Sequence, residues 1–312
     1  MLWLNAHRAD LDEAFAEGER IINMFPDGLN RLGLAYFAKF DMRREDSTKN
    51  YICYLLPYWM KEIVAVPDSA ARKLCLANVF VMLYYFVVDD VMDSATGEHR
   101  DKLPLANLFQ LQFQSIYREL YPPHSPFWHH YESYVREWAD AVAGESTRDP
   151  FYTDRKQVAW KASPVKNAST GALLLAGRED LVPVVTEAVD QVLICLQMLD
   201  DWVDWEEDLA EGTYNCLLAF LRRSADRPGE EPMTAEWVKQ QVFVQDRLEG
   251  FKEIAASHQE DVRRLGLPLH ELAQFQSGLV NDLQAAADEI KEKRLKLLSG
   301  GFYYFMSETS NF

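Results

Sequence analysis

Apolar residues recur at helical spacing along almost the whole chain. From about residue 8 to the C-terminus, long apolar-periodic segments alternate with short stretches rich in Pro, Gly, Asp or Ser, and strict alternation of apolar and polar residues is rare. The breaks fall near residues 26–28, 67–69, 97–104, 122–126, 144–150, 183, 212, 228–232 and 266–268. The pattern predicts on the order of ten helices and few strands.

The sequence shows no division between these helices that would separate two domains. No period of repeats divides the chain, and no Gly/Ser linker interrupts it. Charged residues, Pro and Gly concentrate around Arg222 to Pro232, where we expect a long loop. The sequence therefore predicts a single all-α domain over residues 1–312, a large helical bundle with a cavity between its helices.

Two acid-rich segments follow apolar runs in which burial is expected. The first, F-V-V-D-D-V-M-D, follows L-A-N-V-F-V-M-L-Y-Y, and the second is Q-M-L-D-D-W-V-D-W-E-E-D. Each contains the pattern D-D-x-x-D. The acidic residues are Asp89, Asp90 and Asp93 in the first segment, and Asp200, Asp201, Asp204 and Asp208 in the second.

The helical period brings these carboxylates together within each segment. Residues i, i+1 and i+4 share one side of a helix, so Asp89 and Asp93 stack one turn apart. Carboxylates withdrawn from water are costly unless they are paired or bind a metal. If the two rows of carboxylates faced each other, they would form a site made of oxygen ligands alone. Such a site suits Mg²⁺, because that ion binds carboxylates, waters and substrate phosphates.

A solvated helix face is the alternative interpretation of one acidic cluster. Two copies of the pattern, each preceded by a helix too apolar for a surface position, favour a joint metal role. All seven carboxylates are therefore candidate metal ligands.

Composition restricts the class of protein further. The chain has 312 residues, 48% of them apolar, and a net charge of −17, which argues against a nucleic-acid partner. Its four cysteines, Cys53, Cys75, Cys195 and Cys216, lie on apolar stretches without C-x-x-C spacing, which indicates buried free thiols. No signal peptide and no uncharged run long enough to span a bilayer is found, so we expect a cytoplasmic protein without a transmembrane segment.

The two motifs resemble those of the class I isoprenoid synthases, the trans-isoprenyl diphosphate synthases and terpene cyclases. D-D-V-M-D resembles their first aspartate-rich motif, and Gln197 followed by D-D-W-V-D resembles their Q-x-x-D-D-x-x-D. The segment E-D-L-A-E-G-T-Y-N at 207–215 and S-T-G-A-L-L at 169–174 are also similar to family segments. The resemblance covers residues 80 to 220.

The resemblance implies an all-helical fold and three Mg²⁺ ions that bind an allylic prenyl diphosphate. The metal ions stabilise the charge on the departing diphosphate, leaving a carbocation in a cavity that excludes water. Bulky aromatic residues one turn before the first motif, here Tyr84, Tyr85 and Phe86, limit pocket depth in such enzymes and imply a ligand of about fifteen to twenty carbons. Core packing is the alternative role for each ring. Homodimers are common in the family, and a homodimer is implied here.

Departures from the family pattern bear on the reaction. The elongating synthases hold a second diphosphate with basic segments that this chain lacks or displaces. Ser169 replaces the lysine of K-T-G, and Thr213 replaces the lysine after E-G. Without these basic residues a second diphosphate would bind poorly. The sequence therefore favours a reaction with a single diphosphate substrate.

Basic residues remain for one diphosphate. The candidates are Lys161, Lys166, Arg100, Arg178 and Arg294. Arg178 is the first choice because it can give bidentate bonds, with a salt bridge to Glu179 or Asp180 as the alternative. Arg294 is expected to contribute to a lid, with a solvated basic helix end as its alternative.

The sequence thus predicts a Mg²⁺-dependent terpene synthase that converts an allylic prenyl diphosphate to a cyclic or linear terpene. A short-chain prenyl diphosphate synthase that joins isopentenyl diphosphate to an allylic diphosphate is the first alternative. A catalytically silent partner of another prenyl synthase is the second.

Overall fold

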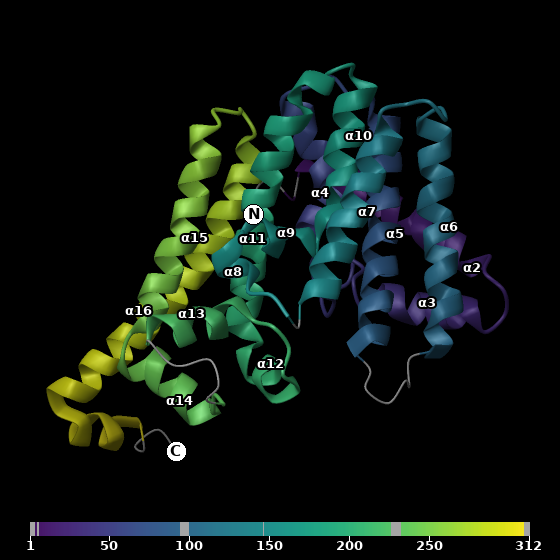
Figure 1. The fold of residues 1–312 in the computed structure, drawn as a ribbon. Coiled ribbons are helices and arrows are strands. Elements are labelled where there is room, and N and C mark those ends of the chain that lie inside the picture. The colour runs from purple at the N-terminus through teal and green to yellow at the C-terminus, as the bar shows by residue number, and fades with distance from the viewer. Residues whose placement is uncertain (1–3, 5, 94–99, 146, 226–231, 309–312) are drawn as a thin grey trace. The chain divides into compact units, whose positions relative to one another are not determined.

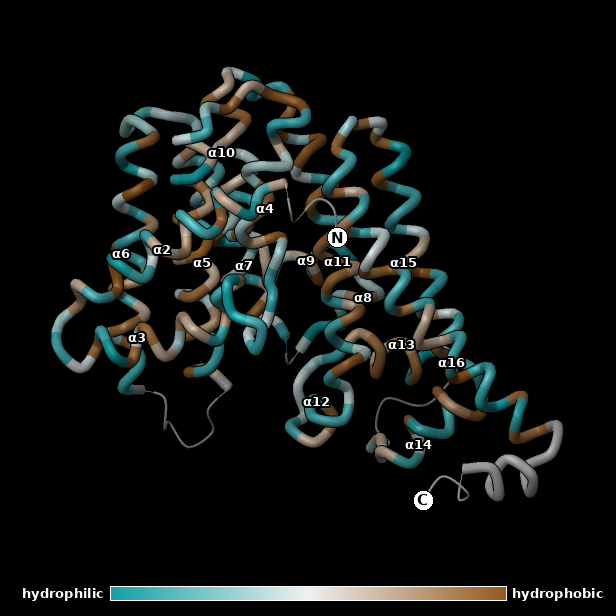
Figure 2. The backbone as a smooth tube through the Cα atoms, turned by 180° about the vertical axis from the view of Figure 1, so that it is seen from behind, coloured by the Kyte–Doolittle hydropathy of each residue, from teal (hydrophilic) through white to brown (hydrophobic). Residues whose placement is uncertain are grey.

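The chain is all-α, as its periodicity predicts. The computed structural model (Figure 1) describes residues 4, 6–93, 100–145, 147–225 and 232–308, with side chains except at 93, 100 and 299–308. The described residues form fifteen α-helices and no strand. Short hydrophobic and hydrophilic stretches follow one another in turn along α6, α15 and α16, as Figure 2 shows. Each of these helices therefore has one apolar face to bury.

The helices divide into two compact units. Unit 1 contains residues 1–136, 162–186 and 268–272, and unit 2 contains residues 137–161, 187–267 and 273–312. The boundary falls within three helices: α7 (Phe127–Gly144), α11 (Val182–Val203) and α16 (His270–Glu308). The single-domain organisation stays a prediction.

Unit 1 is built around α5 (Asp68–Asp93), which packs against α2, α4, α6 and α10. The other helices of unit 1 are α2 (Arg8–Asn23), α3 (Leu29–Ala38), α4 (Tyr51–Trp59), α6 (Leu103–Leu120) and α10 (Asn167–Leu175), with the short 3₁₀ turns η1 (Met60–Glu62), η2 (Arg100–Lys102), η3 (Ser163–Lys166) and η4 (Glu179–Leu181).

The composition of α5 explains its central position. From Leu74 to Leu83 every side chain is buried, including the polar Asn78. A helix that is apolar on all sides is stable only when neighbours cover it all round. Burial decreases over the last three turns, where Tyr84, Phe86 and Asp89 are partly or fully exposed.

Unit 2 contains most of α11 together with α15 (Arg247–Arg264) and α16. Cys195 of α11 donates to the carbonyl of Ala255 in α15, and Gln276 of α16 donates to the carbonyl of Gln191 in α11. The remaining elements are α8 (Pro150–Thr153), α9 (Lys156–Trp160), α12 (Trp205–Glu211), α13 (Cys216–Ser224), α14 (Ala235–Lys239) and the π-helical turn η5 (Gln240–Val244).

Two sequence predictions concern these elements directly. The four cysteines are buried free thiols, as expected. The loop expected from Arg222 begins later, because α13 continues to Ser224. Arg222 and Arg223 occupy the last turn of that helix, where positive charge is favourable, and residues 226–231 lie outside the described part of the chain.

Two helical segments are long and apolar enough to cross a membrane by length and composition alone. Among the described residues these are Asp68–Met92 and Glu179–Val203, and 61% of each apolar window is buried inside the protein. Burial of that extent is the pattern of core helices, so neither segment is a clear transmembrane span.

Candidate functional site

The first acidic motif closes the central helix of unit 1. Asp89 and Asp90 lie in the last two turns of α5, and Asp93 is its final residue. Asp89 is exposed and Asp90 is half-buried, while the side chain of Asp93 lies outside the described part. The C-terminal end of a helix carries partial negative charge, so each carboxylate here is disfavoured by a few tenths to about 1 kcal/mol.

A lysine and a tyrosine contact Asp90. The ammonium of Lys102, at the end of η2, lies 2.9 Å from Asp90 Oδ2. Burial of Tyr36 in α3, and then the negative charge of Asp90, raise the pKa of Tyr36 well above its usual range. The Lys102 ammonium also lies 5.7 Å from the centroid of the Tyr36 ring. The sequence motifs indicate neither residue.

The second motif lies at the end of α11 in unit 2. Asp200 and Asp204 are exposed, whereas Asp201 is 4% exposed. Both oxygens of Asp201 are fixed: Gln197 Nε2 donates to Oδ1 at 2.7 Å, and the backbone N–H of Cys216 donates to Oδ2 at 2.6 Å. The first turn of α13 therefore holds Asp201 in one orientation, as helix N-termini do for anions.

Asn215 connects Asp201, near the end of α11, to Asp208 in α12. Its side-chain amide donates to Asp208 Oδ2 at 2.7 Å and to the backbone carbonyl of Asp201 at 2.8 Å. Its Oδ1 accepts from the N–H of Leu218 and caps α13. The segment E-D-L-A-E-G-T-Y-N gave the sequence signal for this residue, although its contacts depend on the turn at Gly212, which has φ +77°.

The carboxylates of the second motif lie close enough to one another to repel. Although Asp200 is exposed as a residue, the protein atoms around its carboxyl group partly desolvate it and raise its pKa to about 6. The charges of Asp204, Asp201 and Asp208 raise this pKa further, and the charge of Lys161 lowers it. Partial desolvation by neighbouring atoms also raises the pKa of the exposed Asp204, and the charge of Asp208 raises it further. A divalent cation near these carboxylates would relieve their repulsion, and carboxylates are among the ligands that Mg²⁺ accepts.

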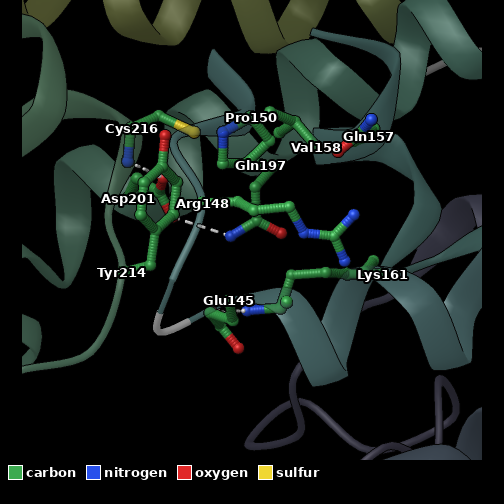
Figure 3. A pocket seen from close by; sticks show the side chains of 12 residues that line it. Glu145, Arg148, Pro150, Gln157, Val158, Lys161, Gln197, Asp201, Tyr214 and Cys216 are labelled. Carbon is green, nitrogen blue, oxygen red and sulfur yellow. Dashed lines mark hydrogen bonds and ion pairs between the residues drawn. The ribbon is translucent and has the colours of Figure 1, made fainter. Parts of the chain in front are cut away.

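A pocket of unit 2 opens beside the second motif (Figure 3). Lys161, Gln197 and Asp201 are among its lining residues, together with Tyr214 and Arg148. Lys161 Nζ is 2.5 Å from Glu145 Oε1, and its charge opposes the raised pKa of Asp201. The predicted residues Lys161, Gln197 and Asp201 thus line one pocket.

Three of the other four predicted basic residues contact other side chains. Arg178 donates through Nε and Nη2 to both oxygens of Asp180, each at 2.8 Å, so the alternative predicted salt bridge is present. Arg294 forms an ion pair with Asp246, and the side chain of Arg100 lies outside the described part. Lys166 is completely buried, with its ammonium 4.8 Å from the Tyr134 ring centroid.

The predicted aromatic residues belong to aromatic clusters of unit 1. Tyr84 contacts Tyr85 and Phe113, with ring centroids 4.9 and 5.8 Å apart, and Phe86 lies 5.0 Å from Phe40. All three predicted rings are half-buried. Each residue therefore packs against another ring and keeps part of its surface exposed.

Within the described residues, no group of three or more His, Cys, Asp or Glu side chains is placed so that it could hold a metal ion. No protein-family model matches the chain, and no curated protein matches it.

Proposed function

We propose that this chain is a Mg²⁺-dependent class I terpene synthase of the isoprenoid synthase fold. It ionises an allylic prenyl diphosphate of about C15 to C20, which releases diphosphate and leaves a carbocation in an apolar cavity. Loss of a proton from this cation, or capture of water by it, then gives a cyclic or linear terpene. One observation carries the proposal: each D-D-x-x-D terminates a long, largely buried helix, α5 or α11. Acids are unfavourable at that end of a helix, and a bound cation compensates them.

The carboxylates proposed to hold Mg²⁺ are Asp89, Asp90, Asp93, Asp200, Asp201, Asp204 and Asp208. When bound, the metal supplies Lewis-acid stabilisation of the leaving diphosphate. The chain itself positions the carboxylates. Gln197 and the N–H of Cys216 fix the orientation of Asp201, and Asn215 fixes Asp208.

Lys161 is the basic residue best placed to contact an anion near the second motif. Its side chain is one-third exposed, and its present partner Glu145 belongs to the same pocket. Lys166 and Arg178 are weaker candidates, because the first is completely buried and the second holds Asp180 in a bidentate pair. The aromatic rings of Tyr84, Tyr85 and Phe86 are suited to contact a hydrocarbon chain and its cation.

Product analysis tests this proposal. The purified protein is incubated with Mg²⁺ and a C10, C15 or C20 allylic diphosphate, each with and without isopentenyl diphosphate, and organic extracts are analysed by mass spectrometry. A terpene formed from one allylic diphosphate alone is the expected result. A longer diphosphate that appears only with the C5 unit would instead identify a prenyl diphosphate synthase, and folded protein without any product would favour a silent partner.

Asparagine substitutions link any product to the motifs. We expect Asp90→Asn and Asp200→Asn each to lower turnover by about a hundredfold or more, because they remove charge from the metal ligands but preserve side-chain shape. Asp282→Asn, at an exposed position of α16, is the control and should retain full turnover. Unchanged turnover in both motif variants would contradict the metal assignment. Asp201 is less suitable for this test, because its replacement also disturbs the hydrogen bond that its carboxylate accepts from the N–H of Cys216 in α13.

A further inference from the structure

Lys102 places a fixed positive charge on the first acidic motif. Its side chain is 16% exposed and that of Asp90 is 35% exposed, so the 2.9 Å ion pair is partly withdrawn from water. η2 leads directly into α6, which packs along α5, so the position of Lys102 beside the end of α5 is set by helix packing. The Tyr36 ring borders the ammonium on another side.

The ammonium occupies a position that a metal ion at Asp90 also needs. Lys102 Nζ lies 2.9 Å from Asp90 Oδ2, within the distance of an ion pair. An ammonium and a divalent cation cannot both approach one carboxylate oxygen closely, because they repel each other and compete for its lone pairs.

We propose that Lys102 is an internal counterion of Asp90 that exchanges with the divalent cation, an inference that rests on the proposed metal role of the first motif. In the metal-free protein Lys102 neutralises Asp90. When the metal binds, the ammonium leaves Asp90 and becomes available to the anion that accompanies the metal. Metal and diphosphate then bind cooperatively, because each relieves a charge left by the other.

Chemical labelling follows the release of Lys102 without measuring activity. The protein is treated with a limiting amount of an acetylating reagent, with and without Mg²⁺, and acetylation of each lysine is quantified by mass spectrometry. We expect Mg²⁺ to increase acetylation of Lys102 by roughly threefold or more, since the reaction reports the unpaired fraction of this lysine. Lys73, paired with Glu119 on the exposed surface of unit 1, is the internal control and should not change.

Metal binding gives the second readout. Mn²⁺ is titrated into the wild type, Lys102→Met, Lys39→Met and Asp90→Asn, and free Mn²⁺ is measured by electron paramagnetic resonance. Lys102→Met should bind Mn²⁺ about fivefold more tightly, because the metal no longer displaces an ion pair. Lys39 is the matched control: its ammonium lies 5.1 Å from the same Tyr36 ring, so Lys39→Met removes a nearby charge and should change affinity much less.

The outcomes separate this inference from the proposed function. Equal affinity in the wild type and Lys102→Met, or constant Lys102 acetylation while Mn²⁺ is bound, overturns the exchange but leaves the metal role intact, provided that Asp90→Asn weakens binding. If Asp90→Asn binds Mn²⁺ as tightly as the wild type, the metal role of Asp90 fails, and the exchange fails with it.

Discussion

The imidazole of His258 is held in one protonation state by its neighbours in unit 2. It is 6% exposed, and Nδ1–H donates to Gln191 Oε1 at 2.5 Å. Arg155 donates to Nε2 at 3.4 Å, so that nitrogen must be unprotonated. Burial, and then the charge of Arg155, lower the pKa of His258 to about 4, with Asp261 opposing them.

This pKa predicts how stability depends on pH. An exposed imidazole has a pKa of about 6.5, so between that value and 4 the unfolded chain binds a proton that the folded chain does not. The free energy of unfolding should therefore decrease as the pH falls through this window, by up to about 3 kcal/mol from this residue alone. Urea unfolding at several pH values measures the effect.

A difference between variants isolates the contribution of His258. Carboxylates titrate in the same range, and Asp200, with its raised pKa, changes stability in the opposite direction. His258→Gln should flatten the acid side of the stability profile, whereas His124→Gln, at an exposed position, should leave the wild-type slope. A wild-type slope in His258→Gln would refute this account.

Individual contacts of the candidate site were less predictable than its motifs. The carboxylates follow from sequence because the helical period alone groups them. Lys102 and Tyr36 approach Asp90 only through the packing of α6 and α3, which no local pattern encodes. Arg178 shows the opposite case, since its partner Asp180 is two residues away and was predicted as the alternative.

At the scale of helices, α10 approaches its neighbours unusually closely at Gly171. A Cβ at this position would lie 2.4 Å from the Tyr121 hydroxyl and 3.0 Å from Leu74 Cδ2 of α5. Tyr121 cannot easily move, because its ring stacks on Phe127 with centroids 3.9 Å apart. The glycine in S-T-G-A-L-L therefore has a packing role in this protein.

Replacing this glycine tests the role directly. Gly171→Ala should lower the free energy of unfolding by about 1–3 kcal/mol, because the added methyl group displaces rigid neighbours. Gly278→Ala is the matched control: it lies within α16, and a Cβ added there would meet no atom within 4 Å, so alanine should be neutral or more stable by up to about 1 kcal/mol. Equal changes in the free energy of unfolding for the two substitutions would show that helix propensity alone determines the effect, and that Gly171 has no special packing role.

The presence of a helix was easier to predict from the sequence than the residues that pack around it. The apolar run of α5 and the periodicity of α11 specify long buried helices, and both are present. The end of α13 was predicted too early, because charged residues at 222 and 223 also suit a loop. The polar residues Ser163, Lys166 and Asn167 are buried, which their composition does not predict, because burial depends on covering neighbours distant in sequence.

At the scale of the whole molecule, net charge influences both stability and metal binding. The chain carries −17, and its two acidic motifs add clustered negative charge to that excess. Such repulsion opposes compact structure, and monovalent salt screens it without regard to position. A cation held by the motifs would act differently, because binding only to the folded chain shifts the folding equilibrium by mass action.

Thermal unfolding in MgCl₂ and NaCl at equal ionic strength distinguishes these two effects. If Mg²⁺ occupies the motifs at a hundred times its dissociation constant, each site stabilises the folded chain by about 2.7 kcal/mol, so the midpoint should rise by several degrees more than in NaCl. Asp200→Asn should show a higher midpoint than the wild type without Mg²⁺, because it removes one of the repelling carboxylates, and a smaller Mg²⁺ response. Asp282→Asn lowers the net negative charge by the same amount on exposed α16 and should keep the full response. Identical Mg²⁺ responses in the two variants would mean that the cation acts only through general screening, and the carboxylates of the second motif would then be a solvated acidic surface.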